Sequence, residues 1–232
     1  MTQHYIIGDV HGEYQTLLTL ISQLPKNAEL IFVGDLIDRG DESREVVEFV
    51  RQNDYRVIMG NHEAFMIRYG EAFIAAVSQG QQPDMNNVWT FAGGIETLRS
   101  YDLIEGHYTI INDSQALKNL QNDIDWMKSL PLYLELVYPI NRRKVVISHA
   151  SIGDFWHLRH TKPDDFSFYA LSNRHPPSSQ SPIFNIYGHT VVPDVVITDS
   201  YVSLDTGCGK DREAKLSAFC IEAGEVVSVQ IS

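Results

Sequence analysis

Polar side chains that can bind metals or move protons recur directly after short apolar stretches of this chain. Three glycine-containing motifs show the pattern: GDVHG at residues 8–12, GDLIDRG at residues 34–40 and GNHE at residues 60–63. Two later apolar stretches end in SHA at residues 148–150 and GHT at residues 188–190. The carboxylate, amide and imidazole groups at these five places belong to Asp9, His11, Asp35, Asn61, His149 and His189.

These ligand types point to a particular metal chemistry. Carboxylate, amide oxygen and imidazole suit manganese, zinc or iron rather than copper. Six protein ligands are too many for one catalytic zinc, which usually takes three, but they fit two metals that share one carboxylate. Two divalent cations roughly 3.5–4 Å apart can activate a water and stabilise an in-line attack on phosphorus. A single Gly-Asp pair is commonly a turn, so the inference depends on the whole ordered set.

The elements around the motifs predict how the ligands meet. The first third alternates strands, expected at residues 5–7, 30–33 and 56–59, with helices expected at residues 13–24 and 41–53. This alternation is typical of an α/β layered sheet. Ligands of such sheets bind in the crevice beyond the carboxyl ends of the strands, which is where the motifs lie. Further helices are expected at residues 63–77, 87–101 and 114–129.

The second half of the chain returns to strands. They are expected at residues 132–137, 145–147, 184–187, 195–198, 202–204, 216–221 and 226–231. Their short spacing predicts an antiparallel meander that forms a second sheet. Residues 176–182, rich in proline and serine, are expected to form a loop. No linker or repeat is visible, so residues 1–232 are predicted to form a single domain.

Composition excludes several classes of protein. The 232 residues carry a formal net charge of −12, which argues against a nucleic-acid partner. Phosphate ligands are still compatible with this charge, because bound cations reverse its sign locally. No stretch approaches the roughly 20 apolar residues that span a bilayer, so no membrane partner is expected. Residues 1–5 show no signal-peptide pattern, and the expected location is the cytoplasm. The oligomeric state is left open.

The motifs resemble those of the phosphoprotein phosphatase family of metallophosphoesterases, whose pattern is GDxHG, GDxxDRG, GNHE and two separated histidines. Within that family, the small bacterial and phage protein phosphatases carry segments similar to WTFAGG at residues 89–94, LSNR at residues 171–174 and DTG at residues 205–207. The resemblance covers nearly the whole chain. It implies an α/β calcineurin-like metallophosphoesterase fold, a two-sheet β-sandwich flanked by helices.

The resemblance also implies a role for each ligand. Asp9, His11 and Asp35 match the ligands of a first divalent metal ion. Asp35 is expected to bridge to a second metal ion, whose other matching ligands are Asn61, His149 and His189. Manganese is the expected metal because bacterial relatives often use it, and iron and zinc are the alternatives.

Catalytic and phosphate-binding roles follow from the same match. His62 corresponds to the general acid that protonates the leaving oxygen, and Asp38 is expected to pair with it. Arg39, Arg174 and Asn61 are expected to bind the substrate phosphate, since a guanidinium can grip two oxygens at once. Glu63 is expected to support the site or cap a helix rather than bind metal. Cys208 is expected to be a structural thiol.

The implied activity is hydrolysis of phosphate monoesters, with a hydroxide activated by the two metals as the nucleophile and no covalent intermediate. Phosphoserine and phosphothreonine in proteins or peptides are the expected substrates, with small phosphate esters as further ones. The alternative is symmetrical hydrolysis of diadenosine tetraphosphate, by enzymes of the same family that share GDVHG and the DTGC ending at residues 205–208. Those enzymes are usually longer and lack counterparts of Asp38 and Glu63. A metal-holding binding module without catalysis is a third reading.

Overall fold

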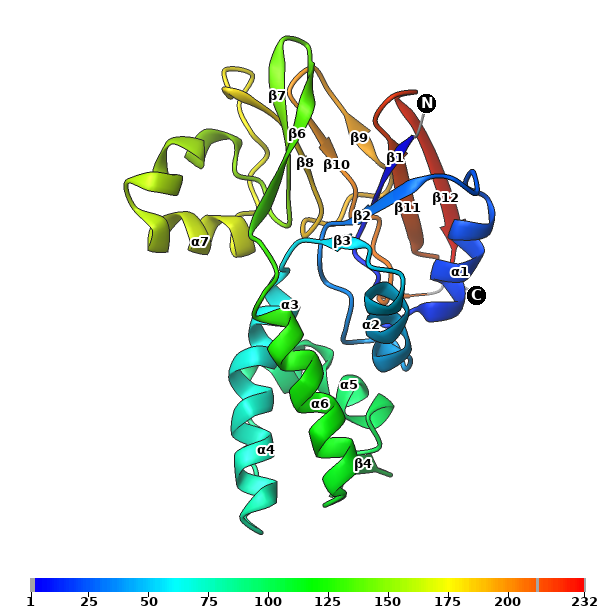
Figure 1. The fold of residues 1–232 in the computed structure, drawn as a ribbon, viewed down its shortest axis with the longest axis vertical. Helices are drawn as coiled ribbons and strands as arrows, with labels where there is room; N and C mark the ends of the chain where they lie inside the picture. The colour runs from blue at the N-terminus through cyan, green and yellow to red at the C-terminus, as the bar shows by residue number, and fades with distance from the viewer. Residues whose placement is uncertain (1–2, 212, 232) are drawn as a thin grey trace.

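The computed structural model describes residues 3–211 and 213–231. Residues 1 and 2, part of the segment 1–5 that shows no signal-peptide pattern, lie outside the described residues. Two five-stranded sheets face each other (Figure 1). The first has the order β12-β11-β1-β2-β3, with bounds β1 His4–Ile7, β2 Glu29–Phe32, β3 Arg56–Val57, β11 Lys215–Cys220 and β12 Glu225–Gln230.

The second sheet has the order β6-β7-β8-β10-β9. Its strands are β6 Tyr133–Ile140, β7 Arg143–Ser148, β8 Ile183–Tyr187, β9 Val196–Ile197 and β10 Tyr201–Ser203. The prediction that all the later strands form one antiparallel meander is wrong in two respects. β8 pairs in parallel with both β7 and β10. The last hairpin leaves this sheet, and β11 pairs antiparallel with β1 of the first sheet, because β1 is buried and its free edge needs a partner.

A shared core holds the two sheets together. Ile6, Ile31 and Val33 from the first sheet and its strand ends belong to the same buried cluster as Val145 and Ile186 from the second. The structure therefore confirms the α/β fold of two packed sheets flanked by helices. Since one core serves both sheets, we infer that they form a single domain.

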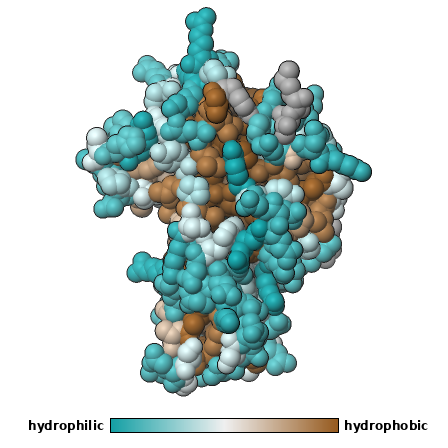
Figure 2. Space-filling model, in the orientation of Figure 1, coloured by the Kyte–Doolittle hydropathy of each residue, from teal (hydrophilic) through white to brown (hydrophobic). Residues whose placement is uncertain are grey.

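Helices cover the sheets and extend from them. α1 packs on β11 and β12, whereas α4 and α6 form a helical lobe that projects away from the sheets (Figure 1). On the face shown in Figure 2, apolar residues gather over the sheets, and the helical lobe is mostly hydrophilic. The helices of the amino-terminal and middle parts are α1 Tyr14–Ser22, α2 Ser43–Gln52, α3 Asn61–Phe65, α4 Glu71–Ser78, α5 Ile95–Ser100 and α6 Ser114–Met127.

Two predicted helices contain irregular turns. The helix expected at residues 63–77 runs from α3 to α4 through a π-helical turn, η1, at Met66–Gly70. The helix expected at residues 87–101 consists of a second such turn, η2 (Thr90–Gly94), and α5. Gly93 interrupts it with a φ of 116°, which only glycine adopts readily. At this break the backbone oxygen of Gly93 accepts a hydrogen bond from the backbone nitrogen of Arg39, 3.3 Å away.

Some elements of the structure were not predicted from the sequence. They are a 3₁₀ helix η3 at Gly153–His160, α7 at Pro163–Ser172 and a small hairpin of β4 Ile104–Glu105 and β5 Thr109–Ile110. Pro163 at the first position of α7, with two aspartates in the first turn, is a helix-start signal that was overlooked. The loop expected at residues 176–182 is confirmed. Within the described ranges, no helix is long and apolar enough to span a membrane.

Candidate metal centre

The five motifs meet in one crevice at the carboxyl ends of strands from both sheets. Asp9 and His11 follow β1, Asp35 follows β2 and Asn61 follows β3, whereas His149 and His189 follow β7 and β8. The crevice encloses about 40 Å³. It is lined by Asp9, His11, Asp35, Arg39, Asn61, His62, Arg174, His189, Val191, Asp205 and Lys210. The predicted convergence of these stretches is confirmed.

The backbone is bent sharply where the ligands leave the strands. His11, Asp35 and His189 have φ values of 49°, 50° and 64°, in the left-handed region that non-glycine residues rarely adopt. Backbone strain of this kind clusters at functional sites. Two glycines make room for the carboxylates: a Cβ at Gly60 would collide with Asp35 Oδ1, and one at Gly188 would collide with Asp9 Oδ1. The glycines of the motifs therefore admit the acidic side chains to the crevice.

Asp35 is common to two groups of side chains that are able to hold a metal ion. One group is His11, Asp35 and His62, the other is Asp35, His149 and His189, and within each the ligand atoms lie within 4.8 Å of one another. Asp35 Oδ2 lies 3.7 Å from His11 Nε2, and its other oxygen, Oδ1, lies 3.5 Å from His149 Nε2. One carboxylate thus faces two histidine clusters, as expected of a dinuclear centre.

The histidine hydrogen bonds leave nitrogen lone pairs in the crevice. The Nδ1 atoms of His11 and His149 lie 2.9 and 3.0 Å from the backbone oxygens of Ile37 and Val33. A carbonyl accepts, so each Nδ1 donates and each Nε2 carries a lone pair. His149 Nε2 then faces another acceptor, Asn61 Oδ1, at 2.8 Å. Lone pairs that face each other in this way fit a cation between them.

Burial keeps these imidazoles neutral. It lowers the pKa of His11 well below its usual value, lowers that of His149 and lowers that of His189 to about 3. Neutral imidazole is the form that binds metals. His189 Nε2 is buried without a hydrogen-bond partner among the described residues. A buried polar atom without a partner is costly, and a cation ligated there would remove the cost.

The acidic groups also fit bound cations. Burial, together with the nearby Asp205 and Asp35 carboxylates, raises the pKa of Asp9 well above its usual value. Burial opposes ionisation of Asp35 as well, but the imidazoles of His149 and His62 outweigh it and hold the pKa of Asp35 low. Carboxylates packed this closely repel one another unless positive charge lies among them. The donor set therefore suits two divalent cations.

His62 has a different partner from the other histidines. Its Nδ1 lies 2.6 Å from Asp38 Oδ2, and Asp38 is completely buried. Asp38 Oδ1 accepts hydrogen bonds from Trp89 Nε1 at 3.0 Å and from Thr97 Oγ1 at 2.6 Å. Although burial lowers the pKa of His62, the Asp35 carboxylate and the Asp38 hydrogen bond raise it overall. The pairing of Asp38 with His62 is present as predicted.

Both arginines that are expected to bind phosphate line the crevice. Arg39 Nη2 is 3.3 Å from His62 Nε2, and Arg174 Nη1 donates to the backbone oxygen of His189 at 3.2 Å. Within the WTFAGG segment, position 93 requires glycine, because a Cβ there would lie 2.5 Å from the backbone nitrogen of Arg39. Both guanidinium groups therefore line the crevice, as phosphate-binding groups must.

Four further residues near the crevice are not predicted to bind metal or phosphate: Glu63, Asp205, Cys208 and Lys210. Asp205 and Lys210 line the crevice. The sequence indicates Asp205 only through the resemblance of its DTG segment, and no sequence motif indicates Lys210. Glu63 accepts hydrogen bonds from the backbone nitrogens of Asp35, Leu36 and Gly60, each 2.8 Å long, so it supports the site as expected. Cys208 is buried, and burial raises its pKa well above the usual value. Its thiol is thus protonated and structural.

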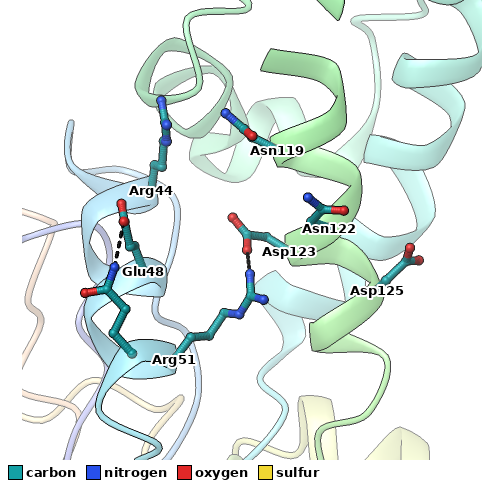
Figure 3. A pocket seen from close by; sticks show the side chains of 8 residues that line it. Arg44, Glu48, Arg51, Asn119, Asn122, Asp123 and Asp125 are labelled. Atoms are coloured by element: carbon teal, nitrogen blue, oxygen red, sulfur yellow. Dashed lines mark hydrogen bonds and ion pairs between the residues drawn. The ribbon is translucent and has the colours of Figure 1, made fainter. Parts of the chain in front are cut away.

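A larger hollow lies away from these motifs. It measures about 570 Å³ and separates α2 from α6 (Figure 3). Arg51 and Asp123 form an ion pair across it, and Tyr101 donates to Asp123 Oδ2 at 2.7 Å. Within the part of the chain that the structure describes, no metal-type cluster lies there. The Arg51–Asp123 ion pair connects α2 to α6 across this hollow, and none of the five motifs contributes to its lining.

Comparisons with known proteins agree with this geometry. Residues 4–197 match the family described as calcineurin-like phosphoesterase. A symmetrical bis(5'-nucleosyl)-tetraphosphatase of Erwinia tasmaniensis is 30% identical over 159 residues, 66% of this chain and 46% of that protein. Serine/threonine-protein phosphatase 2 of Escherichia coli is 40% identical over 93 residues, 39% of this chain and 38% of that protein. The chain thus spans less than half the length of these two relatives.

One solved structure shares the fold over the full length. It is the crystal structure of a putative diadenosine tetraphosphatase, with a TM-score of 0.63 and 18% sequence identity. The similarity covers 99% of this chain and 93% of that one. At this identity the likeness establishes the arrangement of strands and helices alone.

Proposed function

The chain belongs to the calcineurin-like phosphoesterase family, and on that premise we propose that it hydrolyses phosphoesters at a centre of two divalent cations. The observation that carries the proposal is the position of Asp35. Its two oxygens face different histidine clusters, in a buried crevice that two arginines also line. This arrangement supports binding of an anionic phosphate beside paired cations.

The residues divide between two cation sites. We assign Asp9, His11 and Asp35 to the first site, and Asn61, His149 and His189 to the second, which shares Asp35. Two divalent cations bound there would supply positive charge to the phosphoryl oxygens and make water a better nucleophile. Manganese is the proposed metal, with iron and zinc as alternatives, because the donors are oxygen and imidazole groups.

The chain's own side chains bind the phosphate and move a proton. Arg39 and Arg174 hold phosphoryl oxygens through charge-assisted hydrogen bonds, and the Asn61 amide assists them. Asp38 orients His62 and favours its protonated form. His62 then donates the proton on Nε2 to the leaving oxygen, which prevents the build-up of negative charge there.

For the substrate, the comparisons favour a dinucleoside tetraphosphate. The Erwinia tasmaniensis relative, a symmetrical bis(5'-nucleosyl)-tetraphosphatase, matches 66% of this chain, and further relatives at 29% identity carry the same description. We therefore propose symmetrical cleavage of diadenosine tetraphosphate to two nucleoside diphosphates. The sequence motifs favour phosphoproteins and keep diadenosine tetraphosphate as the alternative, so the proposal exchanges the two.

A specific observation favours phosphoserine or phosphothreonine as a second candidate. The buried Asp38–His62 pair forms a well-oriented general acid. A serine alkoxide is a poor leaving group that needs such an acid, whereas a nucleoside diphosphate leaves as a stabilised anion. A stretch of 93 residues is also 40% identical to a serine/threonine-protein phosphatase. Hydrolysis of small aryl phosphates is compatible with either candidate function.

Turnover of three substrates by one preparation tests the proposal. Protein supplied with manganese is incubated with diadenosine tetraphosphate, a phosphoserine peptide and p-nitrophenyl phosphate, and bound metal is measured in parallel. We expect two metals per chain and release of ADP alone from the dinucleotide. Faster turnover of the phosphopeptide would favour the second candidate. Protein that binds two metals but hydrolyses none of the three would contradict catalysis and leave a binding module.

A further inference from the structure

Lys210 carries no role in the assignments above, although it lines the crevice. We propose that Lys210 is a specificity-determining residue that binds the phosphate next to the one attacked, so that the site prefers polyphosphate chains to isolated phosphate groups. The inference rests on the proposed phosphoesterase function and concerns which phosphoesters the crevice accepts.

The loop between β10 and β11 holds Lys210 at the crevice. Gly207 and Gly209 have φ values of 87° and 76°, and the backbone nitrogen of Lys210 donates to the Gly207 oxygen at 3.0 Å, which closes a tight turn. Gly209 lies directly on the site, because a Cβ there would be 2.5 Å from His11 Cβ and 3.3 Å from Arg39 Cβ. The turn therefore sets Lys210 beside the end of the crevice formed by these two side chains.

The ammonium group of Lys210 also lacks a direct hydrogen-bonding or ion-pair partner within the part of the chain that the structure describes. The guanidinium groups of Arg39 and Arg174 lie against the His62 ring and the backbone oxygen of His189, and the proposed function assigns them to the attacked phosphate. Lys210, in contrast, makes no ion pair or side-chain hydrogen bond among the described residues, although its charge lowers the pKa of Asp205, which burial raises. An unpaired ammonium on a crevice of a chain with net charge −12 concentrates positive charge where an anion enters.

The chemistry of lysine fits the second phosphate rather than the attacked one. An attacked phosphoryl group changes geometry and is gripped best by planar, bidentate arginines. A neighbouring phosphate of a polyphosphate chain needs only a point charge on a flexible stem, which lysine supplies. A monoester offers nothing to this ammonium. Lys210 should thus lower KM for polyphosphates and leave monoester turnover unchanged.

The test compares Lys210→Ala with a matched control. Lys118→Ala removes the same charge from an exposed position on α6, in the helical lobe. We expect Lys210→Ala to lower kcat/KM for diadenosine tetraphosphate about tenfold, mostly through KM, because a charged hydrogen bond typically contributes this much. Turnover of p-nitrophenyl phosphate should stay within about twofold of wild type. Lys118→Ala should change neither substrate, and Lys210→Arg should restore most of the loss.

Binding of product-like anions separates this inference from the proposed function. Affinities of the metal-loaded protein for pyrophosphate and orthophosphate are measured by calorimetry. Lys210→Ala should weaken pyrophosphate binding about tenfold and leave orthophosphate binding unchanged. If the wild type hydrolyses no substrate, the function fails while this comparison still decides the role of Lys210. Equal losses for both anions, or no loss for pyrophosphate, would overturn the inference.

Discussion

His62 and Asp38 form a buried pair in which Nδ1 and Oδ2 lie 2.6 Å apart. The Nδ1 atoms of His11 and His149 meet backbone carbonyls instead. A carbonyl fixes a neutral tautomer, whereas a carboxylate favours the protonated ring. The hydrogen-bond partner on Nδ1 thus distinguishes His11 and His149, which suit metals, from His62, which suits proton transfer. His62 nevertheless belongs, with His11 and Asp35, to a group of side chains able to hold a metal ion.

Replacing His62 by asparagine tests that separation. We expect His62→Asn to lower turnover of a phosphoserine peptide by about 100-fold or more, because it removes the proton donor. Bound metal, measured by mass spectrometry, should change little. Loss of one metal per chain would instead make His62 a ligand. Gln79→Ala, at an exposed position after α4, serves as the control.

Asp35→Asn should abolish both metal binding and hydrolysis. Its two oxygens face both clusters, so this single change disturbs the two sites together. Metal content by mass spectrometry and turnover of p-nitrophenyl phosphate should both fall to background. Asp125→Asn, on the exposed face of α6, should retain both. Retention of two metals by Asp35→Asn would mean that Asp35 does not bridge them.

The methyl group introduced by Gly188→Ala should weaken metal binding without a change in any ligand. A Cβ at Gly188 would collide with Asp9 Oδ1, so the carboxylate must move. We expect about a 10- to 100-fold loss of affinity at one metal site, as for other residues that hold a ligand in place. Manganese titration followed by calorimetry measures this. Gly80→Ala, outside the crevice lining, adds a Cβ that meets nothing within 4 Å; its φ of 69° strains alanine locally, but both metal affinities should stay intact.

Removal of metal should destabilise the protein more at neutral than at acidic pH. Burial and neighbouring carboxylates raise the pKa of Asp9, so the folded metal-free protein holds a proton that the unfolded chain has lost. The contribution of Asp9 to the free energy of unfolding of the metal-free protein therefore falls as the pH rises. The fall begins near pH 4, about the usual aspartate pKa, and continues up to the raised pKa of the folded protein. Bound cations reverse the effect and compete better with protons at higher pH. Thermal melts with and without chelator at pH 5.5 and 7.5 should show the larger difference at pH 7.5; an equal difference would contradict this.

Tyr101→Phe should reduce stability without affecting hydrolysis. The completely buried Tyr101 donates its hydroxyl hydrogen to Asp123 between α2, α5 and α6, away from the crevice. Loss of this bond should cost about 1–3 kcal/mol of the free energy of unfolding. Urea denaturation measures the loss, and p-nitrophenyl phosphate turnover should match the wild type. A fall in turnover would connect the helical lobe to catalysis.

The sequence by itself determined which side chains converge. Asp9, Asp35 and Asn61 each follow an apolar strand, and parallel strands present their carboxyl ends at one edge of a sheet. Position after a strand, residue type and glycine spacing are local properties, so the motifs could be read in order. The pairing of Asp38 with His62 came from a family resemblance and is present in the structure.

The tertiary structure decided what depends on contacts between distant segments. β11 leaves the second sheet because β1 offers it a buried edge, a choice that no local pattern encodes. Lys210 reaches the crevice because Gly209 packs on His11, a residue nearly 200 positions away. Asp205 is buried beside Asp9 for the same reason. Periodicity and motif spacing describe neighbours along the chain, whereas burial and electrostatic environment arise only when the chain folds.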